Sequence, residues 1–399
     1  MIKRNSYLKK IIPFIDTDLV KVLTGLRRSG KSVMMELIKE ELLKRGVEAE
    51  QILSVNFEDI NYIELREHFK LNDWVKEKSI NIKGKIYLFL DEIQEVANWE
   101  QIINSLRVSM NIDIYITGSN AKLLSSEMAT YLAGRYVQFN IYPFSYHEYL
   151  LARETSDSTK EFQQYILLGG MPFLVNLSYM KEPSRQYLQD VYNSVLLKDI
   201  IQRNSIRDTD LLERILMFAF SNIGNPFSAA SIAKFLKSEN RKQSNDTILN
   251  HLKACTSAFI INKIPRMDLQ GKKLLTINEK YYVADHGLRE ALLGNKQGDV
   301  GQLLENIVCI ELLRRGYKVS VGKIGNLEID FVAEKNEKKM YIQVAYLLAD
   351  EKTVEREFGV YSKIRDNYPK YVLSLDDYDF SRDGIIHENI RNFLLRGDW

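Results

Sequence analysis

The stretch GLRRSGKS, from Gly25 to Ser32, decides the fold of the first part of the chain. It has the form G-x-x-x-x-G-K-S, follows the apolar run Val20–Thr24 and precedes the helical pattern Val33–Arg45. A strand, this loop and a helix in that order predict a phosphate-binding loop, in which backbone N–H groups and the helix N-terminus surround a phosphate. The alternative is a glycine-rich turn that binds nothing, and the matching strand, motif and helix argue against it.

The loop assigns roles to individual residues. Lys31 is expected to reach the β- and γ-phosphates of a bound nucleotide, and the Ser32 hydroxyl is expected to bind Mg²⁺. Arg27 and Arg28 either contact phosphate or face solvent. The other residues expected to line the nucleotide are Gly25, Arg28, Ser29, Gly30 and Val33.

A second apolar run, Ile86–Leu90, ends in the adjacent carboxylates Asp91 and Glu92. Five consecutive apolar residues predict a strand that is buried on both faces, and ligands bind at the carboxyl ends of such strands. Asp91 is therefore expected to hold Mg²⁺, and Glu92 to orient and deprotonate an attacking water, which is typically worth about 10²–10⁴-fold in rate. The alternative is that the two acids only cap the next helix.

Two further positions are candidates for contact with the transferred phosphoryl group. The run Ile112–Thr117 ends before Gly118-Ser119-Asn120, and Asn120 is the first choice for a polar contact, with Thr117 second, because an amide both donates and accepts. Turn formation explains these residues nearly as well. Arg135 is expected to stabilise charge on the phosphoryl group, from its own subunit or from a neighbour, unless it is a solvated arginine at the start of a strand.

Composition narrows the class of protein. The 399 residues are 45% hydrophobic and 27% charged, as in a folded globular protein of two to four domains. Two cysteines, Cys255 and Cys309, do not make a disulfide framework, and five scattered histidines do not predict a metal cage. No apolar run has the length of a membrane span, so we expect a cytoplasmic protein with no membrane partner.

Charge is concentrated in one window. The formal net charge of the chain is +2. Between residues 241 and 280, however, Lys and Arg outnumber Asp and Glu, which predicts contact with the phosphates of DNA, with contact to a protein as the alternative. The basic residues of this window are Arg241, Lys242, Lys253, Lys263, Arg266, Lys272, Lys273 and Lys280.

Hydrophobic patterning predicts an α/β fold in four segments. Residues 1–150 alternate strands and helices, which is typical of a parallel sheet. A helical lid or linker is expected at 151–224, a winged helix at 225–295 with its wing around residues 270–273, and a further α/β domain at 296–399. The strands expected in the first segment are Val20–Thr24, Ile52–Phe57, Ile86–Leu90, Ile112–Thr117 and Val137–Tyr142.

The motifs together resemble a known family. GLRRSGKS, FLDEIQEV, YITGSNAKLLS, LAGRYVQFNIYPFSYHEY and GGMP are similar to a prokaryotic family of AAA+-type, additional-strand P-loop ATPases that end in a winged helix and a nuclease-like domain of unknown function. The resemblance implies that ATP is the nucleotide and that an extra strand lies between the P-loop strand and the acid-ended strand, a place expected for Ile52–Phe57. It also implies that the loop Gly169–Pro172 senses the nucleotide, although Gly-Gly-x-Pro is an ordinary loop signal as well.

The last segment is similar to the restriction-endonuclease-like fold, whose site is Glu, then Asp, then Glu or Gln followed two residues later by Lys. Glu305, Asp330 and Gln343 take the first three places, but Ala345 stands where the lysine belongs. Lys339 is six residues away, about 20 Å along a strand, and is too far to replace it. The domain is therefore expected to be inactive, with a lysine that has moved elsewhere in the chain as the alternative.

These inferences predict a Mg²⁺-dependent ATPase that acts as a nucleotide-driven switch on a winged-helix and nuclease-like module. The expected partners are ATP, double-stranded DNA or a protein through residues 241–280, and further copies of the same chain. The alternatives are a DNA-binding regulator for which ATP is only a conformational ligand, and an active DNA nuclease gated by ATP.

Overall fold

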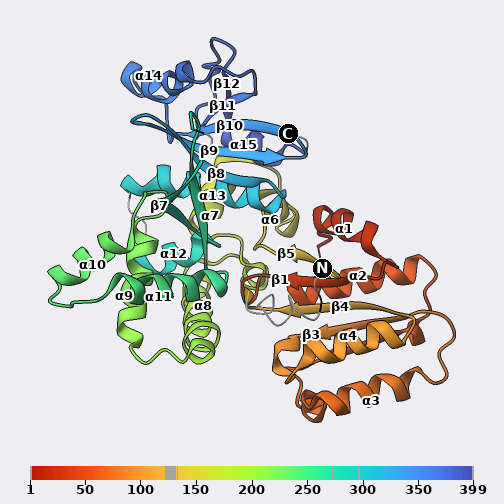
Figure 1. The fold of residues 1–399 in the computed structure, drawn as a ribbon. Helices are drawn as coiled ribbons and strands as arrows, with labels where there is room; N and C mark the ends of the chain where they lie inside the picture. The colour runs from red at the N-terminus through yellow and green to blue at the C-terminus, as the bar shows by residue number, and fades with distance from the viewer. Residues whose placement is uncertain (1, 122–131, 133, 272, 295–296, 398–399) are drawn as a thin grey trace. The chain divides into compact units, whose positions relative to one another are not determined.

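The computed structural model describes residues 2–121, 132, 134–271, 273–294 and 297–397. The chain divides into two compact units (Figure 1). The first is Met1–Tyr142 with Ser257–Phe259, and the second is Pro143–Thr256 with Ile260–Trp399. The sequence predicts four segments, and the last three of them fall largely within the second unit.

A five-stranded sheet forms the centre of the first unit. Its order is β2-β3-β4-β1-β5, and each neighbouring pair is parallel, as predicted. The expectation that Ile52–Phe57 lies between the P-loop strand and the acid-ended strand is wrong, because β2 is at the edge and β4 takes the intervening place. The strands are β1 (Val20–Thr24), β2 (Ile52–Asn56), β3 (Ile86–Asp91), β4 (Ile112–Gly118) and β5 (Tyr136–Asn140).

Helices cover both faces of this sheet, because alternate residues of the central strands point to opposite sides. On one face, Leu88 and Leu90 pack in a core with residues of α3 and α4. On the other face, Phe89 packs in a second core with residues of α1 and α2. The helices are α1 (Asn5–Ile11), α2 (Lys31–Lys44), α3 (His68–Ser79) and α4 (Trp99–Ser109).

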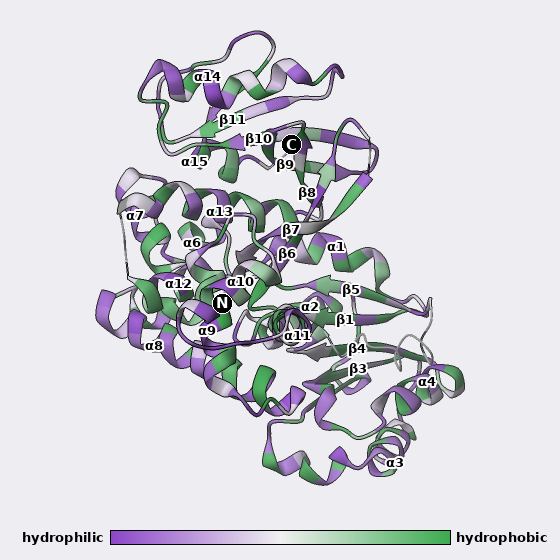
Figure 2. Ribbon diagram, turned by 60° about the vertical axis from the view of Figure 1, so that its left-hand side comes forward, coloured by the Kyte–Doolittle hydropathy of each residue, from purple (hydrophilic) through white to green (hydrophobic). Residues whose placement is uncertain are grey.

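The first half of the second unit is helical. Within the segment predicted as a helical lid or linker, α8 (Lys181–Ser194) continues as a π-helix over Val195–Gln202. Figure 2 shows that α8 is largely hydrophilic, and its buried side chains include Leu188 and Val191. The helices of this region are α6 (Tyr146–Ala152), α7 (Thr159–Leu168), α8 (Lys181–Ser194), α9 (Thr209–Ser221), α10 (Ala229–Ser238), α11 (Asn245–Ser257) and α12 (His286–Leu293). No helix in the described ranges is both long enough and apolar enough to cross a bilayer.

A seven-stranded mixed sheet completes the second unit, in the order β12-β11-β10-β9-β8-β6-β7. The hairpin β6–β7 contains the strands expected as a wing, and β6 pairs in parallel with β8. The boundary expected between residues 295 and 296 therefore does not separate two sheets. The strands are β6 (Ile261–Asp268), β7 (Lys273–Val283), β8 (Lys318–Ile324), β9 (Leu327–Lys335), β10 (Lys338–Val344), β11 (Lys370–Ser374) and β12 (Ile386–Asn389), and the accompanying helices are α13 (Val300–Arg314), α14 (Glu351–Gly359) and α15 (Ile390–Leu395).

Candidate functional site

The loop between β1 and α2 requires glycine at both ends. Gly25 has φ +145°, and a Cβ there would lie 2.2 Å from the Ile141 carbonyl oxygen, so a side chain does not fit. Gly30 precedes α2 with φ +97°, a conformation that L-residues with side chains rarely adopt. Between them Arg28 also has a positive φ, of 67°. The two glycines of the motif thus allow the backbone to curl ahead of the helix.

Lys31 points back into this loop. Its side chain is buried, and its Nζ donates hydrogen bonds to the carbonyl oxygens of Gly25 and Leu26, each at 3.2 Å. The same ammonium lies 3.8 Å from Oε1 of Glu92. The Ser29 hydroxyl is buried and has no hydrogen-bond partner among the described residues. An orphaned hydroxyl and an ammonium at the N-terminus of a helix fit a bound phosphate.

The two acids at the end of β3 are held by one hydroxyl. Thr117 Oγ1 donates to Asp91 Oδ1 and accepts the backbone N–H of Glu92 at 2.9 Å. Burial raises the pKa of the Asp91 carboxyl above its ordinary value, and hydrogen bonds from Thr117 and Ser32 offset only part of this rise. The structure therefore brings Ser32 and Asp91, the two predicted Mg²⁺ ligands, into contact.

Glu92 follows β3 in the left-handed region, with φ 56°. This turn lets Glu92 point differently from the strand residues before it. Its carboxylate is mostly buried, and Oε2 accepts a hydrogen bond from the Gln94 side-chain amide. With Lys31 at 3.8 Å, the Glu92 carboxylate faces the loop.

Thr117, the second choice for a polar contact, lies directly against both acids, and the role of Asn120 stays a prediction. Thr117 bonds both acids, whereas Asn120 is a buried residue two positions beyond the end of β4. Asn120 is the first choice because an amide both donates and accepts, and the Thr117 hydroxyl at the end of β4 reaches the tip of the neighbouring strand β3. The residues 122–131 that follow lie outside the described ranges.

Arg135 lies at the start of β1, at the opposite end of the strands from the loop. Its carbonyl accepts the N–H of Val20, the first residue of β1, and its side chain is exposed. The five residues of β1 separate this position from Gly25 by about 17 Å. This separation does not favour a contact between Arg135 and the nucleotide of its own subunit, and action on a neighbouring subunit stays a prediction. Arg27, in the loop, makes an ion pair with Glu58 at 3.2 Å.

Sequence reasoning missed Arg4, which precedes α1 and is fully buried. Its Nη1 donates to the Ser29 carbonyl at 3.1 Å, and its Nη2 donates to the Tyr142 carbonyl at 2.8 Å. Its guanidinium lies 4.5 Å from the centre of the Tyr7 ring. Arg4 thus ties the phosphate-binding loop to the end of the first unit. No motif marks it, although an arginine before an amphipathic helix is a weak signal.

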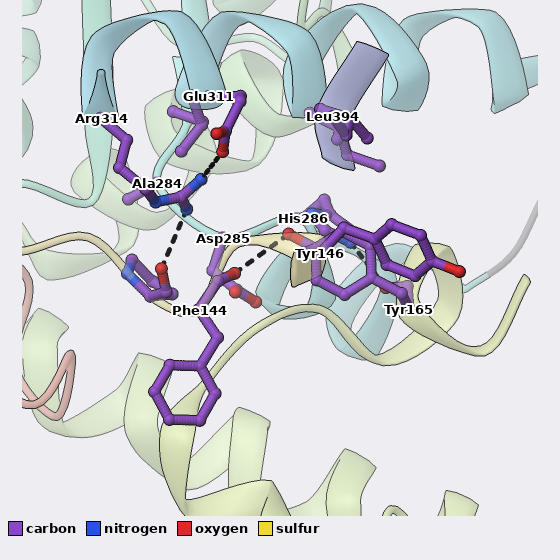
Figure 3. A pocket seen from close by; sticks show the side chains of 12 residues that line it. Phe144, Tyr146, Tyr165, Ala284, Asp285, His286, Glu311, Arg314 and Leu394 are labelled. Carbon is purple, nitrogen blue, oxygen red and sulfur yellow. Dashed lines mark hydrogen bonds and ion pairs between the residues drawn. The ribbon is translucent and has the colours of Figure 1, made fainter. Parts of the chain in front are cut away.

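The loop Gly169–Pro172 belongs to the second unit. Gly170 N donates to Asp285 Oδ2 at 2.7 Å, and a Cβ on Gly169 would lie 2.2 Å from Asp285 Oδ1. Asp285 also lines a cavity (Figure 3), whose volume of about 10 Å³ is room for about one water. His286 is buried beside it, and its Nε2 lies 2.7 Å from the Tyr165 carbonyl oxygen. Asp285 is thus a loop-holding residue that the sequence did not single out.

The positive charge of residues 241–280 is largely paired. Lys280 is buried, and Lys263 lies 2.5 Å from a Glu279 oxygen. Of the seven basic residues of this window that the structure describes, four form ion pairs with acids, which reduces the charge available to phosphate. These four are Arg241, Lys263, Arg266 and Lys280.

The C-terminal acids come together with an unexpected lysine. Glu305 on α13 and Asp330 on β9 lie 3.0 and 3.6 Å from Lys280 Nζ. Gln343 Oε1 accepts the backbone N–H of Asp330 at 3.1 Å, and Ala345 is buried. The Lys339 ammonium instead lies 4.8 Å from the centre of the Tyr341 ring.

Comparisons with known proteins place this geometry in a family. Residues 17–150 match the model of an AAA domain, and residues 159–299 match a domain of unknown function, DUF8612. Among solved structures, the Walker-type ATPase PABY2304 of Pyrococcus abyssi has a TM-score of 0.53 at 15% identity, over 73% of this chain and 96% of that one. The first unit therefore has the fold of an AAA-type P-loop ATPase.

Two relatives extend over nearly the whole chain. An uncharacterized protein of Haemophilus influenzae is 40% identical over 402 residues, which is 99% of each chain. The uncharacterized protein MJ1544 of Methanocaldococcus jannaschii is 30% identical over 393 residues, or 94% of this chain and 85% of that one. The chain belongs to the family that these two proteins represent.

Proposed function

We propose that the protein is a Mg²⁺-dependent ATPase whose nucleotide state switches the second unit. The observation that carries the proposal is the contact between the loop and the acid-ended strand: Lys31 faces Glu92, and Ser32 bonds Asp91. Strand ends, a helix N-terminus and paired carboxylates are the parts that phosphoryl transfer requires.

Each residue has a role in this proposal. The loop amides, Ser29 and Lys31 hold the phosphates, and Glu92 accepts a proton from the attacking water. Thr117 keeps the two acids in place. When bound through Ser32 and Asp91, Mg²⁺ supplies positive charge that offsets the charge of the phosphate oxygens.

The second unit is the proposed output of the switch. The order α10, α11 and the hairpin β6–β7 supports a winged helix, and the order α13-β8-β9-β10-α14-β11 supports a nuclease-like core. The loop Gly169–Pro172, held by Asp285, is the proposed nucleotide sensor. Because four of the seven described basic residues at 241–280 are paired with acids, a protein partner is favoured over duplex DNA.

Steady-state hydrolysis of ATP tests the proposal. Lys31→Ala is expected to abolish nucleotide binding and turnover, and Glu92→Gln to retain ATP but lose turnover by about 10²–10⁴-fold. Lys44→Ala, at the exposed end of the same helix, is the matched control and is expected to behave as wild type. Hydrolysis by Glu92→Gln at the wild-type rate would remove Glu92 as the base.

The same assay separates the rival functions. Stimulation of ATP hydrolysis by duplex DNA would favour the DNA-binding regulator, and we expect no stimulation. Sizing in both nucleotide states, with Arg135→Ala beside wild type, tests whether Arg135 acts on a neighbouring subunit. Plasmid cleavage with Mg²⁺ or Mn²⁺ that Asp330→Ala abolishes would establish an active nuclease.

A further inference from the structure

The second unit contains a buried ammonium group surrounded by carboxylates. Lys280 on β7 places its Nζ 3.0 Å from Glu305, 2.9 Å from Glu328 and 3.6 Å from Asp330. These acids come from α13 and β9, so the lysine joins a hairpin to a different part of the sheet. Its side chain is only 3% exposed.

Several other polar groups around the cluster are also partnered. Tyr282, two residues along β7, donates its hydroxyl to Glu305 Oε1 at 2.5 Å. Arg266 lies 3.2 Å from Glu328, and Asp330 Oδ2 accepts the N–H of Val344 at 2.9 Å. Two cationic side chains therefore face three acids. A buried charge group is tolerated when it is paired and hydrogen-bonded in this way.

The charge state of the lysine follows from these neighbours. Burial alone would lower the pKa of Lys280, but the carboxylates of Glu305, Asp330 and Glu328 outweigh burial and raise its pKa above the ordinary value. The group therefore carries its positive charge throughout the physiological range.

A divalent metal does not fit this arrangement. The nuclease-like fold implies a metal between the acids at positions 305 and 330, yet the ammonium group already lies at salt-bridge distance from both. The described residues contain no group of three or more acids, histidines or cysteines arranged to hold a metal. A second cation beside the ammonium would be repelled at this distance.

We propose that the Lys280 ammonium permanently takes the place of the divalent cation in this acidic cluster. The former metal site then works as an internal salt bridge that fastens the β6–β7 hairpin to α13 and β9, and the unit does not cleave nucleic acid. The inference rests on the proposed nuclease-like core and is independent of the proposed ATPase activity.

The test uses the full chain with Lys280 changed to Met, which keeps the length but removes the charge. Without metal, Lys280→Met is expected to lower the midpoint of thermal unfolding by roughly 6–20 °C, because Glu305 and Asp330 lose their cationic partner and Glu328 keeps only Arg266. Adding Mn²⁺ is expected to recover much of that loss. The double variant Lys280→Met/Asp330→Asn is expected to show no such Mn²⁺ effect.

Two controls make the result specific. Lys263→Met removes an exposed lysine from the adjacent strand β6 and is expected to unfold like wild type, with or without Mn²⁺. Wild type and Asp330→Asn are compared for Mn²⁺ binding by electron paramagnetic resonance. The proposal expects no bound Mn²⁺ that depends on Asp330.

Several outcomes would overturn the proposal. One is Mn²⁺ bound by wild type and lost in Asp330→Asn, because the metal would then displace or accompany the lysine. Another is a Lys280→Met protein that is as stable as wild type, or one that fails to fold both with and without Mn²⁺. ATP hydrolysis measured on the same samples keeps a failure here separate from a failure of the proposed ATPase.

Discussion

At the scale of single residues, Thr117 has the largest consequence for the nucleotide site. One hydroxyl donates to Asp91 and accepts from the Glu92 amide, so it fixes the directions of the expected metal ligand and of the expected base together. A methyl group in its place would leave a buried N–H unpaired, which costs about 1–3 kcal/mol.

Thr117→Val is therefore expected to lower the turnover of ATP by about 10²-fold, because small displacements of catalytic groups have effects of that size. Thr117→Ser keeps the hydroxyl and is expected to retain most of the activity. Turnover at saturating ATP, measured beside the midpoint of thermal unfolding, provides the comparison. Equal activity in Thr117→Val and wild type would show that Thr117 does not position the acids.

Protonation of His286 gives a dependence of stability on pH. Burial lowers the pKa of His286 below its ordinary value, although Asp285 and the Tyr165 carbonyl act in the other direction. The contribution of this group is fully present above the unfolded pKa of about 6.5 and is lost as pH falls toward the folded pKa. The slope for this one proton is at most about 1.4 kcal/mol per pH unit.

Chemical unfolding of wild type and His286→Gln between pH 7.5 and pH 5 checks this expectation. Wild type should lose stability more steeply than the variant. Asp285 has a pKa raised by burial and works in the opposite sense, and the pKa of His387 is also lowered by burial, so the difference between the two proteins is the informative quantity. If the free energy of unfolding changed with pH in the same way in both proteins, the conclusion that His286 is buried and neutral would be contradicted.

At the scale of secondary-structure elements, α1 and the residue before it act as a clamp. Arg4 donates to the carbonyls of Ser29 and Tyr142, and the Tyr7 hydroxyl accepts the N–H of Tyr142 at 3.0 Å. A change in the loop can therefore reach Tyr142 through one guanidinium group. The N-terminal helix belongs to the nucleotide site in this account.

Arg4→Ala is expected to raise the KM for ATP about 10–100-fold, because charged hydrogen bonds to the loop contribute about 1.5–3 kcal/mol. Arg4→Lys should recover only part of the loss, since a single ammonium does not match the two-carbonyl geometry. The exposed neighbour Lys3 provides the control variant, Lys3→Ala. A lower melting midpoint with an unchanged KM would show that Arg4 only stabilises the fold.

Local motifs explain why part of the molecule could be predicted from sequence. β1 begins and ends where the pattern places it, and β3 extends one residue further, through Asp91, because short apolar runs and a glycine-rich loop are properties of neighbouring residues. Strand order is not local: β4 lies between β1 and β3, and nothing in the spacing indicates which strand takes that place.

Contacts between distant residues explain the rest. Arg4 donates hydrogen bonds to the carbonyls of Ser29 and Tyr142, and Lys280 pairs with Glu305 and Asp330. These residues are far apart in the sequence, and hydrophobic periodicity does not predict such contacts. The sequence shows that Ala345 stands where a lysine is expected. It does not show that Lys280 lies beside Glu305 and Asp330, because this depends on the pairing of β6 with β8 in one sheet.

For the full protein, the proposed switch depends on uptake of Mg²⁺-ATP by the first unit. Titration calorimetry of the full chain with ATP, with and without Mg²⁺ and with Lys31→Ala beside wild type, tests this most directly. We expect wild type to bind about one ATP per chain, with higher affinity when Mg²⁺ is present. Folded Lys31→Ala is expected to bind no ATP. Folded wild type that takes up no ATP, or Lys31→Ala that binds as wild type does, would contradict the proposal.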